Sequence, residues 1–274
     1  MNPEKKFITL QRKAERMSKM GGKTIAKNYK KTLDELRITM ARMYKDYEIN
    51  GQLTFAEMSK YNRLQKLDKE VYQLIAGLYS SNSTAIRGTL KGIVEDTYKG
   101  SISIVNNELE NKIRAIIKPI DVTKTINQEM AGLKWTERMG KHRIDAIYEV
   151  QKEIKYGLTK GDTYGTMSNR LKDALETDMG KANRIVRTEG HRCHSQAKEE
   201  SFETIAKAGV KFKEQWISSK DERVRSYHQE LDGVIIERGE MFHSPSGAIG
   251  PGPGLMGNAA DDIHCRCIKI LILE

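Results

Sequence analysis

Apolar residues recur at steps of three and four positions along the first part of the chain. The clearest stripes are Leu33, Leu36, Met40, Met43, Tyr44 and Tyr47, followed by Leu64, Leu67, Val71, Leu74, Ile75 and Leu78. This period predicts amphipathic helices whose apolar faces pack against neighbouring helices. Prolines occur only at positions 3, 119, 245, 251 and 253, so none interrupts such helices over most of the chain.

Glycine and proline indicate where the first helices end or weaken. Asn50-Gly51 predicts a turn between the first two long helices. Gly88, Gly92 and Gly100 favour an irregular helical stretch after it, because glycine destabilises a helix interior. Pro119 then predicts a break in the chain.

Further helices are expected between this break and position 209. A helical face resumes with Ile144, Ile147, Tyr148, Gln151 and Ile154. Gly161-Asp162-Thr163 predicts a new helix start, since Asp and Thr are favoured at helix N-caps. Another helix is expected over residues 178–208, with Gly209 as the glycine that follows its C-terminus.

The pattern changes after Gly209, where apolar and polar residues alternate. Val210, Phe212, Trp216 and Ile217, with Lys211, Lys213 and Gln215 between them, predict a strand. Asp232-Gly233 beside a β-branched run predicts a hairpin-like turn, and residues 267–273 are typical of a buried strand. Residues 244–258, rich in proline and glycine, are expected to form a loop.

These elements predict an α+β fold that is predominantly α. A long helical N-terminal part would be followed by a small C-terminal α+β domain with a short sheet. We expect three regions along the sequence: a basic helical region over 1–118, a second helical region over 119–209, and the small α+β domain over 210–274.

Positive charge is concentrated near the start of the chain. The whole sequence carries a net charge of +10, and residues 1–50 alone hold thirteen basic and six acidic side chains. A basic segment of this kind is attracted to phosphates, so these residues are candidate contacts to nucleic acid or to an acidic partner. The bland alternative is a solvated helix face, which charge runs usually are. The candidate residues are Lys5, Lys6, Arg12, Lys13, Arg16, Lys19, Lys23, Lys27, Lys30 and Lys31.

Neither the start of the chain nor any later stretch has the apolar length of a signal peptide or membrane span. We therefore expect no membrane partner and a cytoplasm-like compartment. The sequence has three cysteines, too few for a disulfide framework, which leaves reduced thiols or metal ligands as the two interpretations.

Five of the six histidines and all three cysteines lie between positions 191 and 267. Cys265 and Cys267 would share one face of a strand, and a histidine such as His228 or His243 could complete a tetrahedral zinc set. Buried free cysteines are the alternative, so no cofactor is expected unless zinc binds here. His191, Cys193 and His194 cannot all share one helix face and are expected to be exposed and incidental.

Known catalytic and nucleotide-binding patterns are missing from the sequence. No serine sits in a nucleophile motif of the G-x-S-x-G type. No glycine loop ends in the Lys-Ser/Thr pair that binds phosphate, and the prolines at 251 and 253 remove N–H donors from the glycine-rich loop. The sequence therefore predicts neither ATP-driven chemistry nor a recognisable hydrolase.

Several short motifs follow one another in the last third of the chain. They are Arg187-Thr188-Glu189 within R-x-x-R-T-E; Trp216; the segment Asp221 to His228 with Arg223 and Arg225; Asp232-Gly233; Phe242 before the Pro/Gly loop; and Cys265-Arg266-Cys267. In this order they resemble the Mu F-like family of phage head morphogenesis, or minor capsid, proteins. The resemblance covers roughly the C-terminal half, because residues 1–118 carry no family motif.

This resemblance implies a structural protein of a tailed-phage head, associated with the portal and the capsid interior. It implies a virion location, with host cytoplasm during assembly, and no catalytic activity. The implied partners are the portal protein, the major capsid or scaffolding protein, and DNA, with a role in head assembly or DNA delivery. The motif residues would then form a polar and ionic network that fixes the small domain on its helix.

Two other function classes remain open at the level of sequence. One is a nuclease- or transferase-like toxin domain that uses His228 with Arg225 and Asp221. The other is a plain nucleic-acid-binding module, which charge alone supports.

Overall fold

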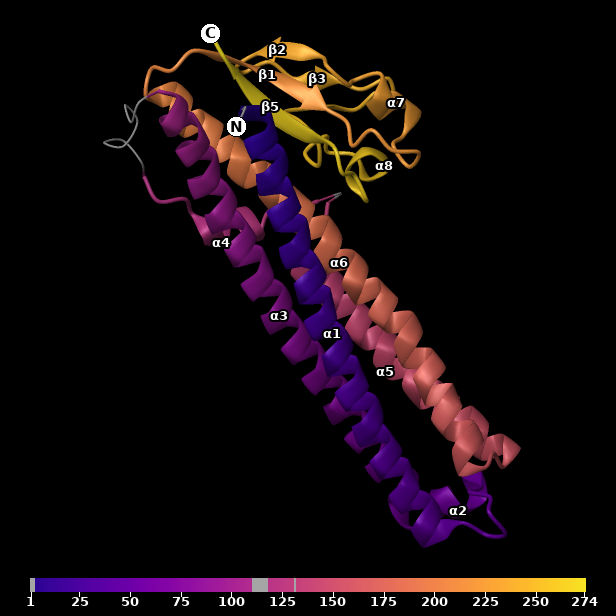
Figure 1. The fold of residues 1–274 in the computed structure, drawn as a ribbon. Helices are drawn as coiled ribbons and strands as arrows, with labels where there is room; N and C mark the ends of the chain where they lie inside the picture. Colours follow the sequence, from indigo (N-terminus) through magenta and orange to yellow (C-terminus); the bar gives the residue numbers. More distant parts are fainter. Residues whose placement is uncertain (1–2, 110–117, 131) are drawn as a thin grey trace. The chain divides into compact units, whose positions relative to one another are not determined.

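A computed structural model describes residues 3–109, 118–130 and 132–274. Figure 1 shows long helices and a small sheet formed by the C-terminal part of the chain. The helices are α1 (Pro3–Tyr47), α2 (Phe55–Ser59), a short 3-10 helix (Lys60–Asn62), α3 (Arg63–Glu108), α4 (Val122–Ile126), α5 (Trp135–Lys160), α6 (Tyr164–Lys207), α7 (Ser226–Gln229) and α8 (Ala259–Asp262). The strands are β1 (Phe212–Ile217), β2 (Ile235–Glu237), β3 (Phe242–His243), β4 (Ile249–Gly250) and β5 (Ile268–Leu273). The expected fold class, predominantly α with a small C-terminal sheet, is confirmed.

The chain forms two compact units, each assembled from separate segments. One unit contains Met1–Gly21, Arg87–Trp135 and Ile185–Glu274, and the other contains Gly22–Ile86 and Thr136–Arg184. The units therefore interleave the three regions expected along the sequence. Long helices that fold back on one another bring distant segments together, which a pass along the sequence cannot reveal.

The unit formed by Gly22–Ile86 and Thr136–Arg184 is a set of packed helical segments. Its core takes Ile25, Leu36 and Met40 from α1, Val71 and Ile75 from α3, Val150 and Ile154 from α5, and Leu171 and Leu175 from α6. Tyr29 and Tyr79 both donate to Asp178 Oδ2, over 2.7 and 2.6 Å. This buried carboxylate thus joins segments of α1, α3 and α6.

The other unit carries the small sheet, whose strand order is β2-β1-β5 with antiparallel pairs. Alternation in β1 buries Phe212, Glu214 and Trp216 on one face. Phe202 of α6 packs edge-on against Phe212, with 5.7 Å between ring centroids. A separate apolar cluster lies beneath the loops: Trp216, Leu231, Phe242, Ala248, Met256, Cys265 and Cys267. The predicted strands over 210–217 and 267–273 are both present.

A buried ionic network connects α6 to the sheet. The Lys269 ammonium group of β5 pairs with Glu199 and, over 2.5 Å, with Glu214 of β1. Arg238 bonds the same two carboxylates and also Glu203. Lys198 donates to the Lys269 carbonyl over 3.0 Å. Because Glu214 and Lys269 are 1% and 5% exposed, their charges must neutralise each other.

The glycines at 88, 92 and 100 do not make the helix irregular, and α3 runs unbroken through them. Two of them permit close approach of α1. A Cβ on Gly92 would lie 2.7 Å from the Met17 methyl group, and one on Gly100 would lie 2.8 Å from Leu10 Cδ1. Their absent side chains make room for packing, which outweighs their poor helix propensity.

The expected helix start at 161–163 is confirmed, since α6 begins directly after Thr163, whose Oγ1 accepts from the Thr166 amide. Two other expectations about helices need correction. No separate helix begins at 178, because this position lies inside α6. Ile144 and Tyr148 of α5 are 65% and 64% exposed, because α5 buries a neighbouring face instead. The turn at Asn50-Gly51 and the glycine at 209, with φ of +83°, are as expected. Within the described part of the chain, no helix has the length and apolarity to cross a membrane.

Candidate functional site

Most of the ten candidate basic residues lie on the solvent-exposed side of α1. All except Lys6 are exposed. Lys6 and Lys13 pair with Glu108 and Asp96 of α3, each over 2.7 Å, and Lys31 lies 3.7 Å from Glu35. These three positions therefore have acidic neighbours that reduce their local charge.

Six of the remaining basic residues follow one face of α1. Successive members are three or four residues apart, so each lies about one helical turn after the previous one. At 1.5 Å per residue, the row extends for about 27 Å. We call this row the basic stripe; it comprises Arg12, Arg16, Lys19, Lys23, Lys27 and Lys30. Among the ion pairs seen between described residues, none involves a member of the stripe.

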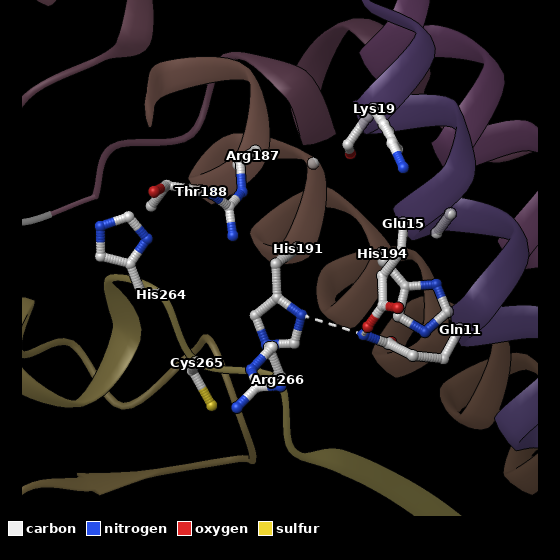
Figure 2. A pocket seen from close by; sticks show the side chains of 13 residues that line it. Gln11, Glu15, Lys19, Arg187, Thr188, His191, His194, His264, Cys265 and Arg266 are labelled. Atoms are coloured by element: carbon white, nitrogen blue, oxygen red, sulfur yellow. Dashed lines mark hydrogen bonds between the residues drawn. The ribbon is translucent and has the colours of Figure 1, made fainter. Parts of the chain in front are cut away.

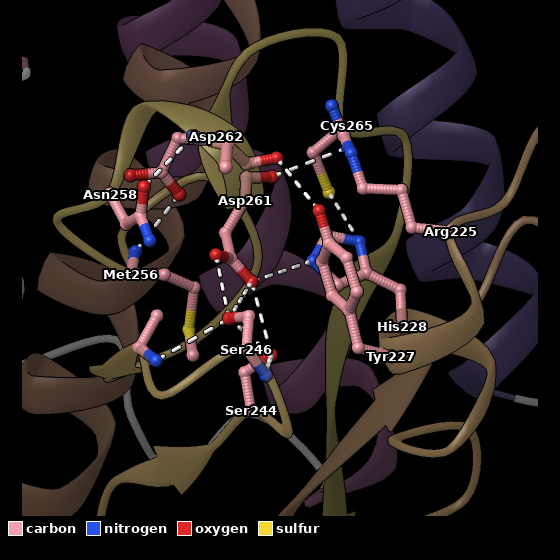
Figure 3. Close-up of polar contacts among 12 residues, drawn as sticks. Arg225, Tyr227, His228, Ser244, Ser246, Met256, Asn258, Asp261, Asp262 and Cys265 are labelled. Atoms are coloured by element: carbon pink, nitrogen blue, oxygen red, sulfur yellow. Dashed lines mark hydrogen bonds and ion pairs between the residues drawn. The ribbon is translucent and has the colours of Figure 1, made fainter.

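A second candidate site lies in the small C-terminal part, where His228 faces the thiol of Cys265 (Figure 3) and also that of Cys267. His228 is on α7, and Cys265 and Cys267 lie in the segment directly before β5. Both sulfur atoms lie 3.7 Å from His228 Nδ1. Potential ligand atoms of all three residues lie within 4.8 Å of one another, and all three side chains are buried. The structure thus brings together the three residues expected to form a metal set, whereas His243 lies on the exposed side of β3.

The opposite edge of the His228 ring contacts a buried carboxylate. His228 Nε2 lies 3.2 Å from Asp261 Oδ1, and both side chains are at most 2% exposed. The hydroxyl groups of Ser244 and Ser246 each lie 3.1 Å from the same oxygen. A carboxylate in this position is an acceptor for a hydrogen bond from Nε2–H, the tautomer in which the Nδ1 lone pair faces the sulfurs.

The surroundings of His228 fix its ring and exclude solvent. Trp216 and Tyr227 meet the imidazole edge-on, with centroid separations of 5.3 and 5.0 Å. Contact with the Cys265 thiol lowers the pKa of Cys267 to about 5, against the opposing effect of burial. The same contact, together with burial, raises the pKa of Cys265. One sulfur of the pair is therefore disposed to carry negative charge.

The remaining motif residues of the segment 221–233 take different roles. Asp221 forms a two-pronged ion pair with Arg266 at partly exposed positions, whereas the Arg223 side chain is exposed. Arg225 donates to the Ile263 carbonyl over 2.5 Å, next to α8. Asp232 Oδ1 accepts from the Ser218 amide over 2.8 Å, and Gly233 adopts a φ of +85° in the turn before β2.

The R-T-E motif lies on α6, where its residues face in different directions. Glu189 is fully buried and pairs with Arg192 over 2.7 Å. Arg187 and Thr188 instead line a cavity of about 380 Å³ with Lys19, His191, His264 and Arg266 (Figure 2). Cys265 also lines this cavity, which therefore reaches the thiol cluster.

The spacing of His194 and Cys193 on a helix predicted exposed side chains. In the structure both are buried. Cys193 is 0% and His194 1% exposed, and His194 Nδ1 lies 2.8 Å from the Thr97 hydroxyl. His191 faces the cavity, and Gln11 Nε2 lies 3.4 Å from its Nδ1. Several segments cover α6 here, so different faces of the helix are buried at once.

Comparison with known proteins adds to this geometry. Residues 148–270 match the family described as Phage Mu protein F like protein. The Mu F-like family assignment is confirmed for this region. The Mu F-like region thus contains α6, the whole small sheet except its last residues, and the His228 cluster.

Individual relatives extend the similarity beyond the Mu F-like region. The chain is 29% identical over 253 residues to "Minor head protein GP7" of Bacillus phage SPP1, covering 92% of this chain and 82% of that protein. It is 25% identical over 260 residues to "NAD(+)--arginine ADP-ribosyltransferase EFV" of Enterococcus faecalis, covering 90% of this chain and 52% of that protein. An uncharacterized protein of Haemophilus influenzae is 26% identical over 154 residues, 56% of this chain and 31% of that protein. No solved structure matches.

Sequence reasoning missed Asp261, Ser244 and Ser246, which complete the surroundings of His228. They lie in or beside the Pro/Gly-rich loop, where no periodicity predicts which side chains face inward. It also missed the pairing of Glu214 with Lys269. The sequence does indicate this pair, because Glu214 and Lys269 lie inside two predicted strands. Charged residues are buried in a strand only when they are paired.

Proposed function

We propose that this protein is a minor head protein of a tailed phage that acts by binding within the virion. The observation that carries the proposal is the match to the SPP1 minor head protein over 92% of the chain. That match includes the N-terminal helices as well as the Mu F-like region. Similarity over both parts favours a shared role over a shared domain alone.

The working surface in this proposal is the basic stripe of α1. Its six cationic side chains face solvent along one helix face, where they can approach a row of phosphates or an acidic protein surface. DNA inside the capsid provides the first kind of surface. The portal protein and the major capsid or scaffolding protein are the proposed protein partners, and assistance in head assembly or DNA delivery is the proposed outcome.

We propose that the chain itself has no catalytic activity. His228 is 1% exposed beneath Trp216 and Tyr227, so a polymeric substrate cannot reach its imidazole. This burial argues against the nuclease- or transferase-like toxin that would use His228 with Arg225 and Asp221. About half of the relative named as an ADP-ribosyltransferase lies outside the matched region, so its named activity can reside in the unmatched part.

Heads purified from the phage that encodes this chain provide the test of the main proposal. We expect mass spectrometry to detect the protein in mature heads or head precursors, and its deletion to reduce the yield of infectious particles. Absence from both kinds of particle would overturn the proposal. A parallel assay with NAD⁺ and an arginine-containing acceptor should show no transfer by the full chain, and activity abolished by His228→Ala would favour the enzyme instead.

A further inference from the structure

We propose that His228, Cys265 and Cys267 bind a zinc ion that joins α7 to the chain segment leading into β5. The donors would be His228 Nδ1 and the two thiolate sulfurs. Each thiol gives up its proton as its bond to zinc forms. This site is independent of whether the protein acts in a phage head.

The distances match those of a tetrahedral zinc site. Zinc–sulfur bonds of about 2.3 Å and zinc–nitrogen bonds of about 2.0 Å place neighbouring sulfur and nitrogen ligands about 3.5 Å apart at tetrahedral angles. Both sulfur atoms lie 3.7 Å from His228 Nδ1. All three potential ligand atoms also lie within 4.8 Å of one another, so they are close enough to share one ion.

Asp261 supplies the second feature of a metal-binding histidine. A ligating imidazole usually donates its other N–H to a carboxylate or carbonyl, which fixes the tautomer and the ring plane. His228 Nε2 lies 3.2 Å from Asp261 Oδ1, and Ser244 and Ser246 hold that carboxylate from the other side (Figure 3). A histidine that only packs in the core does not need a carboxylate that is itself held by two hydroxyl groups, so these contacts favour a metal-binding role.

The donor chemistry favours zinc over the hard cations. Two thiolates and one imidazole form a soft ligand set, whereas magnesium and calcium require oxygen ligands. Three protein donors leave one position of the tetrahedron for a water molecule or another small ligand. Cys265 also lines the cavity beside Arg187 and His191, which gives such a ligand a route to the ion.

The small apolar cluster around the site explains what the ion would contribute. The cluster contains few large side chains, among them Trp216, Phe242 and Met256, and it lies under loops with little regular structure. Zinc would link residues 37 and 39 positions apart in the sequence. Metal binding in such a small domain contributes directly to its folding free energy.

The test measures metal in the full-length protein purified under reducing conditions without chelator. We expect about one zinc per chain, and we expect Cys267→Ser and His228→Ala to bind much less, because each removes a ligand. Cys193→Ser and His243→Ala are matched controls, since they remove a thiol and an imidazole outside the cluster and should retain the metal. Replacement of zinc by Co²⁺ should give the visible and near-ultraviolet bands of a tetrahedral thiolate site.

Measurements on the unmodified chain keep the test decisive even if a ligand variant fails to fold. Chelation should lower its melting temperature, and Zn²⁺ should restore it. X-ray absorption should show two sulfur neighbours around the metal. A folded chain that binds neither Zn²⁺ nor Co²⁺ would overturn the proposal, as would a disulfide between Cys265 and Cys267 in the freshly purified protein, or equal metal loss in Cys193→Ser.

Discussion

Arg192 Nε donates a hydrogen bond to Glu189 Oε2 over 2.7 Å, and the two side chains are 3% and 0% exposed. The same guanidinium group donates to the carbonyls of Thr125 and Ile126 over 3.0 and 3.2 Å. One buried ion pair on α6 therefore holds α4 in place. Glu189 is the acidic member of the R-T-E motif, so its role here is to balance a buried charge.

Substitution Glu189→Ala should destabilise the protein strongly. Removal of one partner of a buried ion pair leaves the other charge uncompensated, which costs about 3 to 5 kcal/mol. Asp221→Ala is the matched control, because Asp221 is also a motif residue with an arginine partner but is 36% exposed, and surface pairs contribute about 1 kcal/mol or less. Urea denaturation measures both free energies of unfolding. Equal losses in the two variants would contradict the assignment.

The shared carboxylate of Asp178 makes a second prediction, for the unit that contains Tyr29 and Tyr79. Burial raises the pKa of both tyrosines, so their hydroxyl groups stay protonated and donate to Asp178. Tyr79→Phe should lower the free energy of unfolding by about 1.5 to 3 kcal/mol, the usual range for a hydrogen bond to a charged group. Tyr164→Phe should change it by less than about 0.5 kcal/mol, because its hydroxyl lies at an exposed position. Thermal unfolding of both variants provides the measurement. Equal decreases in melting temperature would show that the hydrogen bond from Tyr79 to Asp178 does not contribute to stability.

Lys198 should make stability depend on pH. Burial, together with the charge of Lys269, lowers the pKa of Lys198 from 10.5 to about 7. Between these two values the unfolded chain binds more protons at this site than the folded chain does. Its contribution is therefore least favourable below about pH 7 and becomes more favourable as the pH rises towards 10.5.

Lys198→Met should remove this dependence while keeping the volume of the side chain. Unfolding of both proteins is to be measured from about pH 6 to about pH 9, and the stability of the unmodified protein relative to the variant should increase across the series. Lys207→Met, at an exposed position of the same helix, is the control and should give a pH-independent difference. A constant difference for Lys198→Met as well would contradict the lowered pKa.

The basic stripe predicts salt-dependent binding to DNA. Exchange of Arg12, Arg16, Lys19, Lys23, Lys27 and Lys30 for glutamine should weaken binding and reduce its dependence on salt. The logarithmic slope should fall by about 0.9 for each lost phosphate contact. Fluorescence anisotropy with duplex DNA at several salt concentrations provides the measurement.

A variant with the same change in net charge separates the stripe from the overall charge of the protein. It replaces six exposed lysines elsewhere, and should retain most of the slope: Lys60, Lys66, Lys69, Lys91, Lys152 and Lys172. An identical loss in both variants would mean that binding follows net charge alone. Substitution is preferable to deletion of residues 1–31, since that segment contributes buried Phe7, Ile25 and Tyr29.

Periodicity predicted the elements that bury one regular face, but not those whose environment depends on distant segments. The stripe from Leu33 to Tyr47 and the strand at 212–217 follow local patterns and were correctly predicted. The prediction that Gly92 and Gly100 make the helix irregular was wrong, because these glycines make room for side chains of α1. His191, Cys193 and His194 were expected to be exposed because one helix face cannot hold all three. Cys193 and His194 are nevertheless buried, because α6 is covered on more than one side.

In the candidate metal set, too, the sequence predicted only the relationship between neighbouring residues. Cys265 and Cys267 were expected to share a face because they are two positions apart, and both do approach His228. The choice of His228 over His243 depended on the packing of α7, and the role of Asp261 on a loop without a pattern. Contacts between residues far apart in the sequence were thus beyond what spacing could determine.

The glycines of α3 have a consequence for the order of events during synthesis. Glycine weakens an isolated helix, so the stretch around Gly92 and Gly100 gains much of its order from contact with Met17 and Leu10 of α1. The compact unit that contains them also requires residues from 185 onward. During synthesis, residues 3–21 of α1 therefore cannot complete their packing until residues from 185 onward have followed, and their apolar face stays available to chaperones in the interval.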